Sequence, residues 1–399
     1  MAGEIMSTTI DIATYTVCFS GTACTRDEGE VTRIGSDRRI YCPETGYIPV
    51  RLHNEISGDL FSTASSVVVR GVGNNDWAQL RSFCEPLRVD GPLEVPDDLL
   101  REARKYASVD NQHSYIEAAH AWSATALALH GANLAVDSGA RRFNFIGHSR
   151  GAVESIMAAW FLYAYGPREI PVNIFAIDPV PGPGNWYGIL TQLPPNVEHY
   201  VGVYAWDHLD KGFTALVPRP NGPMTGRADA VHLGKKWDTL ADGYQLRDPL
   251  EADTETAQPE RYKLYACRGR HSTVAGNTTG DGQYDPARLG RHVAPVPKLV
   301  YKMARAYLAE WGTRFLAGSE VGERVEALRR QIHTDHTEFD AMGGGAIRTH
   351  RGRLVSASSG RAFWKTSYFE DVVGDPPYTL SYPVTPERTG AGWVNWTFL

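Results

Sequence analysis

The chain has 399 residues, and 40 Lys and Arg against 46 Asp and Glu give it a formal net charge of −6. Its 42% hydrophobic and 22% charged residues are an ordinary globular balance, which excludes a wholly disordered chain. The length favours two or three domains, although one large α/β domain also fits. The mild negative charge argues against nucleic acid as a partner, because nucleic-acid binding needs a concentrated basic face.

The sequence shows neither a membrane anchor nor a secretion signal. No segment approaches the roughly 18 uninterrupted apolar residues of a membrane span. Residues 1–13 carry Glu4 and Asp11 and no basic region. The five cysteines form no close pair of the kind that binds zinc. We therefore expect synthesis in the cytoplasm, no disulfide framework, no metal and no cofactor.

Strands and helices are expected to alternate along the chain. Short β-branched and aromatic runs predict strands at 15–19, 66–70, 142–146, 172–177, 200–205 and 262–267. Apolar periodicity predicts helices at 113–137, 150–165, 296–316 and 321–332. The polar stretch 25–61 is interpreted as a long loop or hairpin, and 207–260 as a loop-rich insertion around a site. The alternation predicts right-handed crossovers and a mostly parallel sheet.

The strongest motif is Gly147-His148-Ser149-Arg150-Gly151, between a predicted strand and a predicted helix. A G-x-S-x-G pattern in this position places its serine on a sharp turn, with the hydroxyl projecting from the carboxyl edge of the sheet. The glycines leave room for a strained backbone, and the helix N-terminus faces developing negative charge. We predict that Ser149 is a nucleophile; the alternative is an inert serine in a tight turn.

A serine nucleophile needs a histidine base. We favour His271, which follows the strand 262–267 and precedes a run of small residues, so that it would lie on a loop at the carboxyl edge of the sheet. His208 is the rival. It also follows a strand, but the only earlier strand after the serine that could supply its acid is 172–177, with Asp178.

Two carboxylates could orient that base. Asp178 ends the strand 172–177, and Asp207 follows the strand 200–205. Both satisfy the order serine, acid, histidine that is typical of α/β-hydrolases. We favour Asp178 because it ends the strand that follows the nucleophile helix, and Pro179 restricts its backbone. Asp207 is the alternative acid.

An oxyanion intermediate would need two N–H donors. The residue after the nucleophile, Arg150, normally supplies one, and an earlier strand-end loop supplies the other. Gly21-Thr22 is the favoured loop, because glycine allows close approach of the backbone; 71–73 is the second candidate. The Arg150 side chain is expected either to pair with an acidic neighbour or to attract an anionic substrate.

Taken together, these motifs resemble those of one family, the bacterial α/β-hydrolases that include type VI secretion lipase effectors. That family has a D-G-T loop, a G-V-G loop, a G-F-S-R-G-A elbow, a strand-end D-T-V and a late G-V-H-S-D-V-G-G-G loop. The matching segments, over about residues 15 to 285, are Phe19-Ser-Gly-Thr22, Arg70-Gly-Val-Gly73, Gly147-His-Ser-Arg-Gly-Ala152, Ile177-Asp-Pro-Val180, Tyr204-Ala-Trp-Asp207 leading to Phe213, and Gly269-Arg-His-Ser272.

The resemblance implies that Ser149, Asp178 and His271 form a triad and that Gly21-Thr22 contributes to an oxyanion hole. The chain departs from the family pattern at several positions. Ser20 stands where the family has Asp, and His148 replaces Phe. Asp-Pro-Val replaces Asp-Thr-Val, and Ser-Thr-Val-Ala-Gly follows the histidine. The resemblance is therefore to a divergent member.

We expect one α/β-hydrolase domain over 14–340, with a cap-like insertion at 181–262 and a C-terminal segment, 341–399, packed on it. The expected reaction is ester hydrolysis through an acyl-enzyme. The resemblance implies a lipid or phospholipid substrate, transient contact with a membrane surface, and an antibacterial effector exported without a signal peptide. Its partner would then be an immunity protein or the secretion apparatus. The alternatives are a soluble carboxylesterase or thioesterase, and a non-catalytic binding protein.

Overall fold

The computed structural model describes residues 13–24, 41–73, 86–108, 120–182, 190, 193–205, 215–218, 260–276, 294–335 and 339. It also gives the backbone of the short strands β7 (Met224–Thr225), β8 (Gln245–Leu246), β10 (Leu354–Val355), β11 (Glu387–Thr389), β12 (Gly392–Val394) and β13 (Trp396–Phe398). Among the described residues, no helix is long and apolar enough to cross a bilayer.

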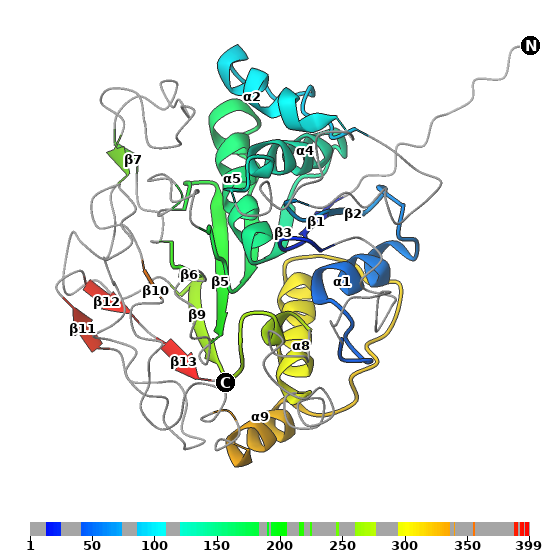
Figure 1. The fold of residues 1–399 in the computed structure, drawn as a ribbon, viewed down its shortest axis with the longest axis vertical. Coiled ribbons are helices and arrows are strands. Elements are labelled where there is room, and N and C mark those ends of the chain that lie inside the picture. The colour runs from blue at the N-terminus through cyan, green and yellow to red at the C-terminus, as the bar shows by residue number, and fades with distance from the viewer. Residues whose placement is uncertain are drawn as a thin grey trace, which may run out of the picture.

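A seven-stranded sheet with the order β13-β9-β5-β4-β3-β1-β2 forms the centre of the molecule (Figure 1). Every neighbouring pair is parallel. This confirms the predicted α/β class and parallel sheet. The strands not yet given bounds are β1 (Tyr15–Phe19), β2 (Ser66–Val69), β3 (Phe143–His148), β4 (Val172–Ile177), β5 (Val197–Ala205) and β9 (Tyr262–Cys267).

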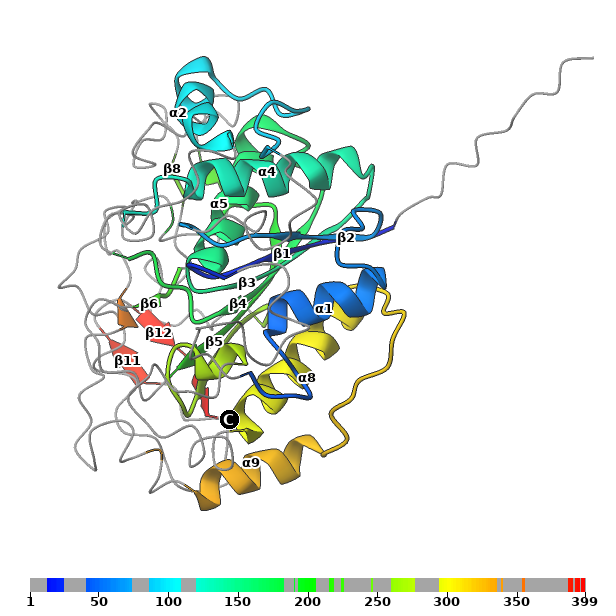
Figure 2. The same ribbon diagram turned by 45° about the vertical axis from the view of Figure 1, so that its right-hand side comes forward.

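Helices cover both faces of this sheet (Figure 2). On one face lie α4 (Ala124–Asp137) and α5 (Arg150–Tyr165), with α2 (Asp97–Ala107) outside them. On the other lie α1 (Ile48–Ser57) and α8 (Pro295–Glu310), with α9 (Val325–Thr334) packed on α8. Successive strand side chains therefore alternate between two hydrophobic cores, one under each helical layer.

The sheet order changes direction between β1 and β3. The chain passes from β1 to the edge strand β2 and then returns to the other side of β1 with β3, after which β4, β5 and β9 add outward. In open parallel sheets the carboxyl ends of the strands at such a reversal form a crevice that suits a ligand. The predicted nucleophile and the favoured oxyanion loop both follow strands at this point.

The interpretation of 25–61 as a loop or hairpin is wrong for residues 48–57, which form α1. Pro49 lies in the first turn of this helix, and Gly58, with φ +68°, ends it by donating its N–H to the Asn54 carbonyl. The buried Ile48, Leu52 and Ile56 recur every fourth residue. One row of apolar residues, spaced by one helical turn within a polar stretch, was too weak a pattern to predict this helix.

Other predicted boundaries move by a few residues. Of the expected helix 113–137, the structure gives α4 from Ala124, while 113–119 lies outside the described residues. The helix expected at 296–316 ends at Glu310, because Gly312 turns the chain with φ +95°. The strand expected at 142–146 continues through His148.

The C-terminal segment joins the main sheet. Its last strand, β13, pairs in parallel with β9, and β10 pairs in parallel with β6 (Ala215–Leu216). The edge of the sheet is thus completed by residues far away in the sequence. The division of the chain at residue 341, and the extent of the cap-like insertion, stay predictions.

A ladder of polar side chains crosses the sheet near its amino edge. Thr16, Asn144, Asn173 and His199 are successive cross-strand partners on β1, β3, β4 and β5. His199 Nδ1 bonds Asn173 Oδ1 at 2.8 Å, and Asn173 Nδ2 donates to Asn144 Oδ1 at 2.8 Å. Thr313, beyond α8, completes the ladder by accepting from Asn144 Nδ2 at 2.8 Å and bonding Thr16 Oγ1 at 2.9 Å.

The end of this ladder predicts a pH dependence of stability. Burial, helped by Arg142 and Arg261 and opposed by Glu198 and Glu310, holds the pKa of His199 below its usual 6.5. As the pH falls below about 6.5, the unfolded chain takes up a proton that the folded chain resists, so this contribution to stability is lost. Melting temperatures should therefore fall more steeply from pH 7.5 to pH 5 in the wild type than in His199→Gln. Parallel pH curves for the two proteins would contradict the prediction.

Candidate active site

Ser149 occupies the strained turn between β3 and α5. Its φ of 57° and ψ of −126° are rare for a residue with a side chain. The turn is held from both sides, since the Ser149 N–H donates to the Ile177 carbonyl at 3.0 Å and its own carbonyl accepts the Ala152 N–H at 3.1 Å. The predicted strand, turn and buried helix are all present around the motif.

Close backbone contacts explain both glycines of the motif. A Cβ at position 147 would lie 2.4 Å from the carbonyl oxygen of Gly151, and a Cβ at position 151 would lie 2.5 Å from the carbonyl oxygens of Phe19 and Ser20. The start of α5 therefore packs directly on the end of β1. This contact brings the favoured oxyanion loop against the serine turn.

The predicted base and the favoured acid are hydrogen-bonded to each other. His271 Nδ1 lies 2.7 Å from Asp178 Oδ2, and the two residues are 4% and 0% exposed. The second carboxylate oxygen, Oδ1, accepts the Ala205 N–H at 3.0 Å. Asp178 adopts φ +41°, a second strained backbone next to the serine turn. Both oxygens of a fully buried carboxylate are thus satisfied.

This arrangement sets the tautomer of the histidine. An ionised carboxylate only accepts, so His271 Nδ1 carries the proton, and Nε2 of the neutral ring keeps its lone pair. No hydrogen bond joins Ser149 Oγ to His271 in the described structure. Ser149 follows His148, whose ring centroid is 4.7 Å from that of His271. Nucleophile–base contacts commonly tighten when substrate binds.

The strand register explains why these residues meet. His148 on β3 is the partner of Ile177 on β4, so Ser149 and Asp178 are the next residues along two neighbouring strands. The Asp178 N–H donates to the Val203 carbonyl on β5 at 2.7 Å, and β5 in turn pairs with β9, which leads to His271. The alternative acid Asp207 and the rival base His208 lie outside the described residues.

The two candidate oxyanion loops pack against each other. The Gly21 N–H is engaged, since it donates to the Tyr47 hydroxyl at 2.6 Å. The Gly71 N–H donates to the Cys24 carbonyl at 2.9 Å, and a Cβ at position 71 would lie 1.7 Å from the Gly21 carbonyl oxygen. The 71–73 loop therefore packs against the backbone of the Gly21-Thr22 loop and supports it. Thr22 is the residue of the first loop that contacts Arg150.

The Arg150 side chain connects the loops around the turn. Its Nη1 donates to Thr22 Oγ1 at 3.1 Å, and its Nε donates to the Pro181 carbonyl at 3.2 Å. The residue is 8% exposed. These contacts join the segments that follow β1 and β4 to the beginning of α5. They give the side chain a structural role, and its expected acidic neighbour or anionic substrate stays a prediction.

Two residues next to the predicted triad had no sequence-based role. The Tyr47 hydroxyl lies 2.9 Å from His148 Nδ1, and His148 Nε2 lies 3.1 Å from the carbonyl oxygen of His271. Tyr47 is 1% exposed and His148 is 5% exposed. The presence of His148 inside the serine motif was one available signal. Tyr47, 102 residues before the serine in a polar stretch, offered none.

Other nucleophiles and metal sites are less well supported. Burial raises the pKa of Cys42 to about 11, aided by its hydrogen bond to Glu44, and burial alone raises the pKa of Cys18. Both thiols are therefore protonated at neutral pH and poorly reactive. Within the described residues, no group of three or more His, Cys, Asp or Glu could hold a metal ion.

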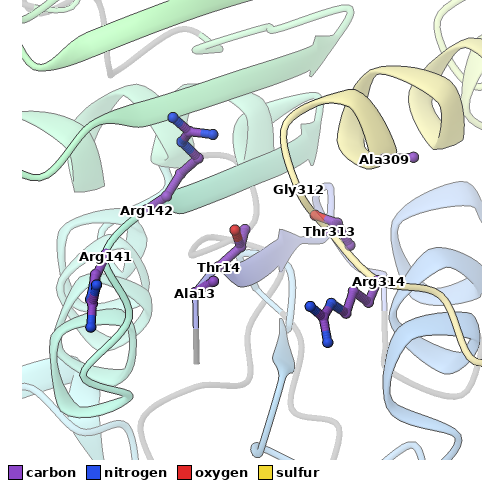
Figure 3. Close-up of a pocket in the computed structure, with 8 residues that line it drawn as sticks. All are labelled: Ala13, Thr14, Arg141, Arg142, Ala309, Gly312, Thr313 and Arg314. Atoms are coloured by element: carbon purple, nitrogen blue, oxygen red, sulfur yellow. The ribbon is translucent and has the colours of Figure 1, made fainter. Parts of the chain in front are cut away.

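Two cavities in the described part of the chain lie away from the predicted triad. One of about 520 Å³ opens near the amino edge of the sheet, and Figure 3 shows the side chains of Arg141, Arg142 and Arg314 pointing in different directions around it. A second, of about 390 Å³, is lined by His199, Lys263 and Tyr307, among others. Neither is lined by Ser149, Asp178 or His271.

Comparison with known proteins leaves the family of this chain open. No family model matches the sequence, and no curated protein matches it. An uncharacterized protein from Pseudomonas aeruginosa, known from a crystal structure, is similar with 13% identity and a TM-score of 0.39. The alignment covers 85% of this chain and 52% of that protein, so this chain spans about half of its length.

The packing of the serine turn predicts that Gly147→Ala is destabilising. The added methyl group would meet backbone atoms of Gly151 and Ala152, which cannot turn aside as a side chain would. We expect the free energy of unfolding to fall by about 1–3 kcal/mol, measured by urea denaturation. Gly318→Ala is the matched control, because nothing lies within 4 Å of its added carbon. Equal stability of the two variants would show that the turn has room to relax.

Proposed function

We propose that the protein is a serine hydrolase with an α/β-hydrolase fold, and that it cleaves carboxylic esters through an acyl-enzyme on Ser149. The observation that carries this proposal is the buried hydrogen bond between His271 and Asp178 beside a serine in a strained strand-to-helix turn. Order along the chain, position at the carboxyl edge and burial agree with a serine, acid, histidine triad.

The chemistry assigns each residue a role. His271 Nε2 takes the proton of Ser149 as Oγ attacks the ester carbonyl carbon, and Asp178 stabilises the imidazolium that forms. The carbonyl oxygen becomes an oxyanion held by the Arg150 N–H and, since the Gly21 N–H is engaged by Tyr47, by the Thr22 N–H. His271 then protonates the departing alcohol. Water, deprotonated by the same nitrogen, releases the acid and restores Ser149.

A lipid or phospholipid is the proposed substrate class, and an exported antibacterial effector is the proposed biological role. Both follow from the motif resemblance to the lipase effectors. An immunity protein, a secretion-apparatus protein and transient contact with a membrane surface belong to the same proposal. A soluble carboxylesterase or thioesterase would use the same triad on a water-soluble ester.

Covalent labelling tests the triad. A fluorophosphonate probe should label the wild-type protein on Ser149, and Ser149→Ala should abolish labelling. His271→Ala should slow labelling and turnover by about 10⁴-fold or more, because the base is lost. His199→Gln, a histidine change at the opposite edge of the same sheet, is the matched control and should label at the wild-type rate. A folded wild-type protein that the probe does not label would leave only the non-catalytic alternative.

A paired substitution identifies the acid in the same assay. Asp178→Asn should lower kcat by about 10⁴-fold, because an amide no longer holds the histidine in the required tautomer. Asp207→Asn should have a much smaller effect. The opposite pattern would reassign the acid to Asp207.

Product analysis tests the substrate class. We expect fatty-acid release from phospholipid vesicles to have a kcat/KM at least tenfold above that for short-chain p-nitrophenyl esters. Mass spectrometry of the released lipids measures it, with Ser149→Ala as the blank. A preference for the short soluble esters or for thioesters would instead support the alternative enzyme.

A further inference from the structure

A chain of hydrogen bonds connects the loop after β1 to the loop that carries His271. It runs from the Gly21 N–H to the Tyr47 hydroxyl at 2.6 Å, from Tyr47 to His148 Nδ1 at 2.9 Å, and from His148 Nε2 to the His271 carbonyl oxygen at 3.1 Å. The Tyr47 and His148 side chains that carry it are at most 5% exposed. The four segments that it joins are the loop after β1, the beginning of α1, the end of β3 and the loop after β9.

The two ends of this chain determine the direction of its two outer bonds. A backbone N–H only donates and a backbone carbonyl only accepts. Tyr47 therefore accepts from Gly21, and His148 donates from Nε2 to the His271 carbonyl; between them, the Tyr47 hydroxyl and His148 Nδ1 are hydrogen-bonded to each other. His148 carries a proton on Nε2, and both of its ring nitrogens are engaged. It is a fixed link between two loops rather than a second base.

Ring packing reinforces the same link. The His148 ring lies 5.7 Å from the Tyr47 ring, edge to face, and 4.7 Å from the His271 ring, at centroid distances. A Cβ at position 21 would lie 2.7 Å from His148 Nδ1, so the Gly21 backbone also contacts the imidazole closely. The histidine thus fills the space between the loop after β1 and the proposed base.

We propose that Tyr47 and His148 are positioning residues for the hydrolase reaction: through these hydrogen bonds they hold the His271 backbone and the Gly21-Thr22 loop in fixed relation to Ser149. The inference rests on the proposed function. Asp178 anchors the ring of His271 at Nδ1, and His148 anchors its backbone, so the ring is held from two directions. The same chain engages the Gly21 N–H, which leaves the contact with the oxyanion to the Thr22 N–H.

The expected effect is on turnover rather than on substrate binding. A displacement of a catalytic group by about 1 Å can cost about 100-fold in rate. His148→Phe keeps an aromatic ring of similar size and removes both hydrogen bonds, and Tyr47→Phe removes the hydroxyl alone. Each should lower kcat, and the rate of fluorophosphonate labelling, by about 10- to 100-fold while KM stays within about twofold.

Non-additivity and rescue distinguish this role from a merely structural one. If the two residues act as one chain, the double variant should be no slower than the slower single variant. His148→Gln should recover part of kcat, because its amide can still donate to the His271 carbonyl. Tyr262→Phe is the matched control: it removes a buried tyrosine hydroxyl that donates to the Pro218 carbonyl at 2.6 Å, and should keep wild-type kcat.

Labelling of the wild type separates failure of this inference from failure of the proposed function. A wild type that labels on Ser149, together with single variants that label at its rate, would overturn the positioning role alone. Additive losses in the double variant, or losses equal to that of Tyr262→Phe, would also overturn it. A wild type that does not label overturns both proposals. If His148→Phe does not fold, Tyr47→Phe and His148→Gln decide the question by the same kcat and KM measurements.

Discussion

The parallel register of β1, β3, β4, β5 and β9 determines where every group of the candidate site lies. These strands end at one edge of the sheet, so the residues that follow them are neighbours although they come from positions 20, 149, 178 and 271. Each of these residues is at most 5% exposed. Backbone pairing between the strands therefore brings the site residues close together, whatever rotamers their side chains adopt.

Two strained backbone conformations also lie at the carboxyl edge of the sheet. Ser149 and Asp178 both have positive φ without being glycine, and they follow adjacent strands. Conformations of this kind cost of order 1–3 kcal/mol each and persist only where surrounding contacts impose them. Those contacts are visible: the Ile177 and Val203 carbonyls hold the two backbones, and Ala205 holds the carboxylate. The two hydrophobic cores provide the rigid support on either side.

Much of this arrangement could be predicted from the sequence. The strands at 15–19, 172–177 and 262–267 and the helix at 150–165 have the predicted bounds, because each is a compact apolar run with Gly, Pro or polar residues at its ends. Chain order and loop positions favoured the pairing of His271 with Asp178 and left Asp207 as the alternative acid. Local sequence patterns are enough to predict an element where its apolar residues form one clear run or repeat.

The rest depends on contacts between distant segments. Residues 48–57 form a helix because α8 and the sheet bury its apolar row, and composition alone does not show that burial. The engagement of Gly21 by Tyr47, and of His148 by His271, joins residues 26 and 123 positions apart. The spacing of apolar residues along the sequence does not predict such long-range hydrogen bonds. The edge strand β13 depends in the same way on β9, more than a hundred residues before it.

The polar ladder across β1, β3, β4 and β5 also bears on how the sheet assembles. A slip of one residue in any of these strands would move its polar side chain to the opposite core, and a slip of two would set it against apolar partners. Either error would leave buried amides unpaired, at about 1–3 kcal/mol for each group. Parallel strands brought together from distant segments form slowly and sample wrong alignments. A misaligned sheet would therefore lose hydrogen bonds at Thr16, Asn144, Asn173 and His199, at the edge opposite the serine.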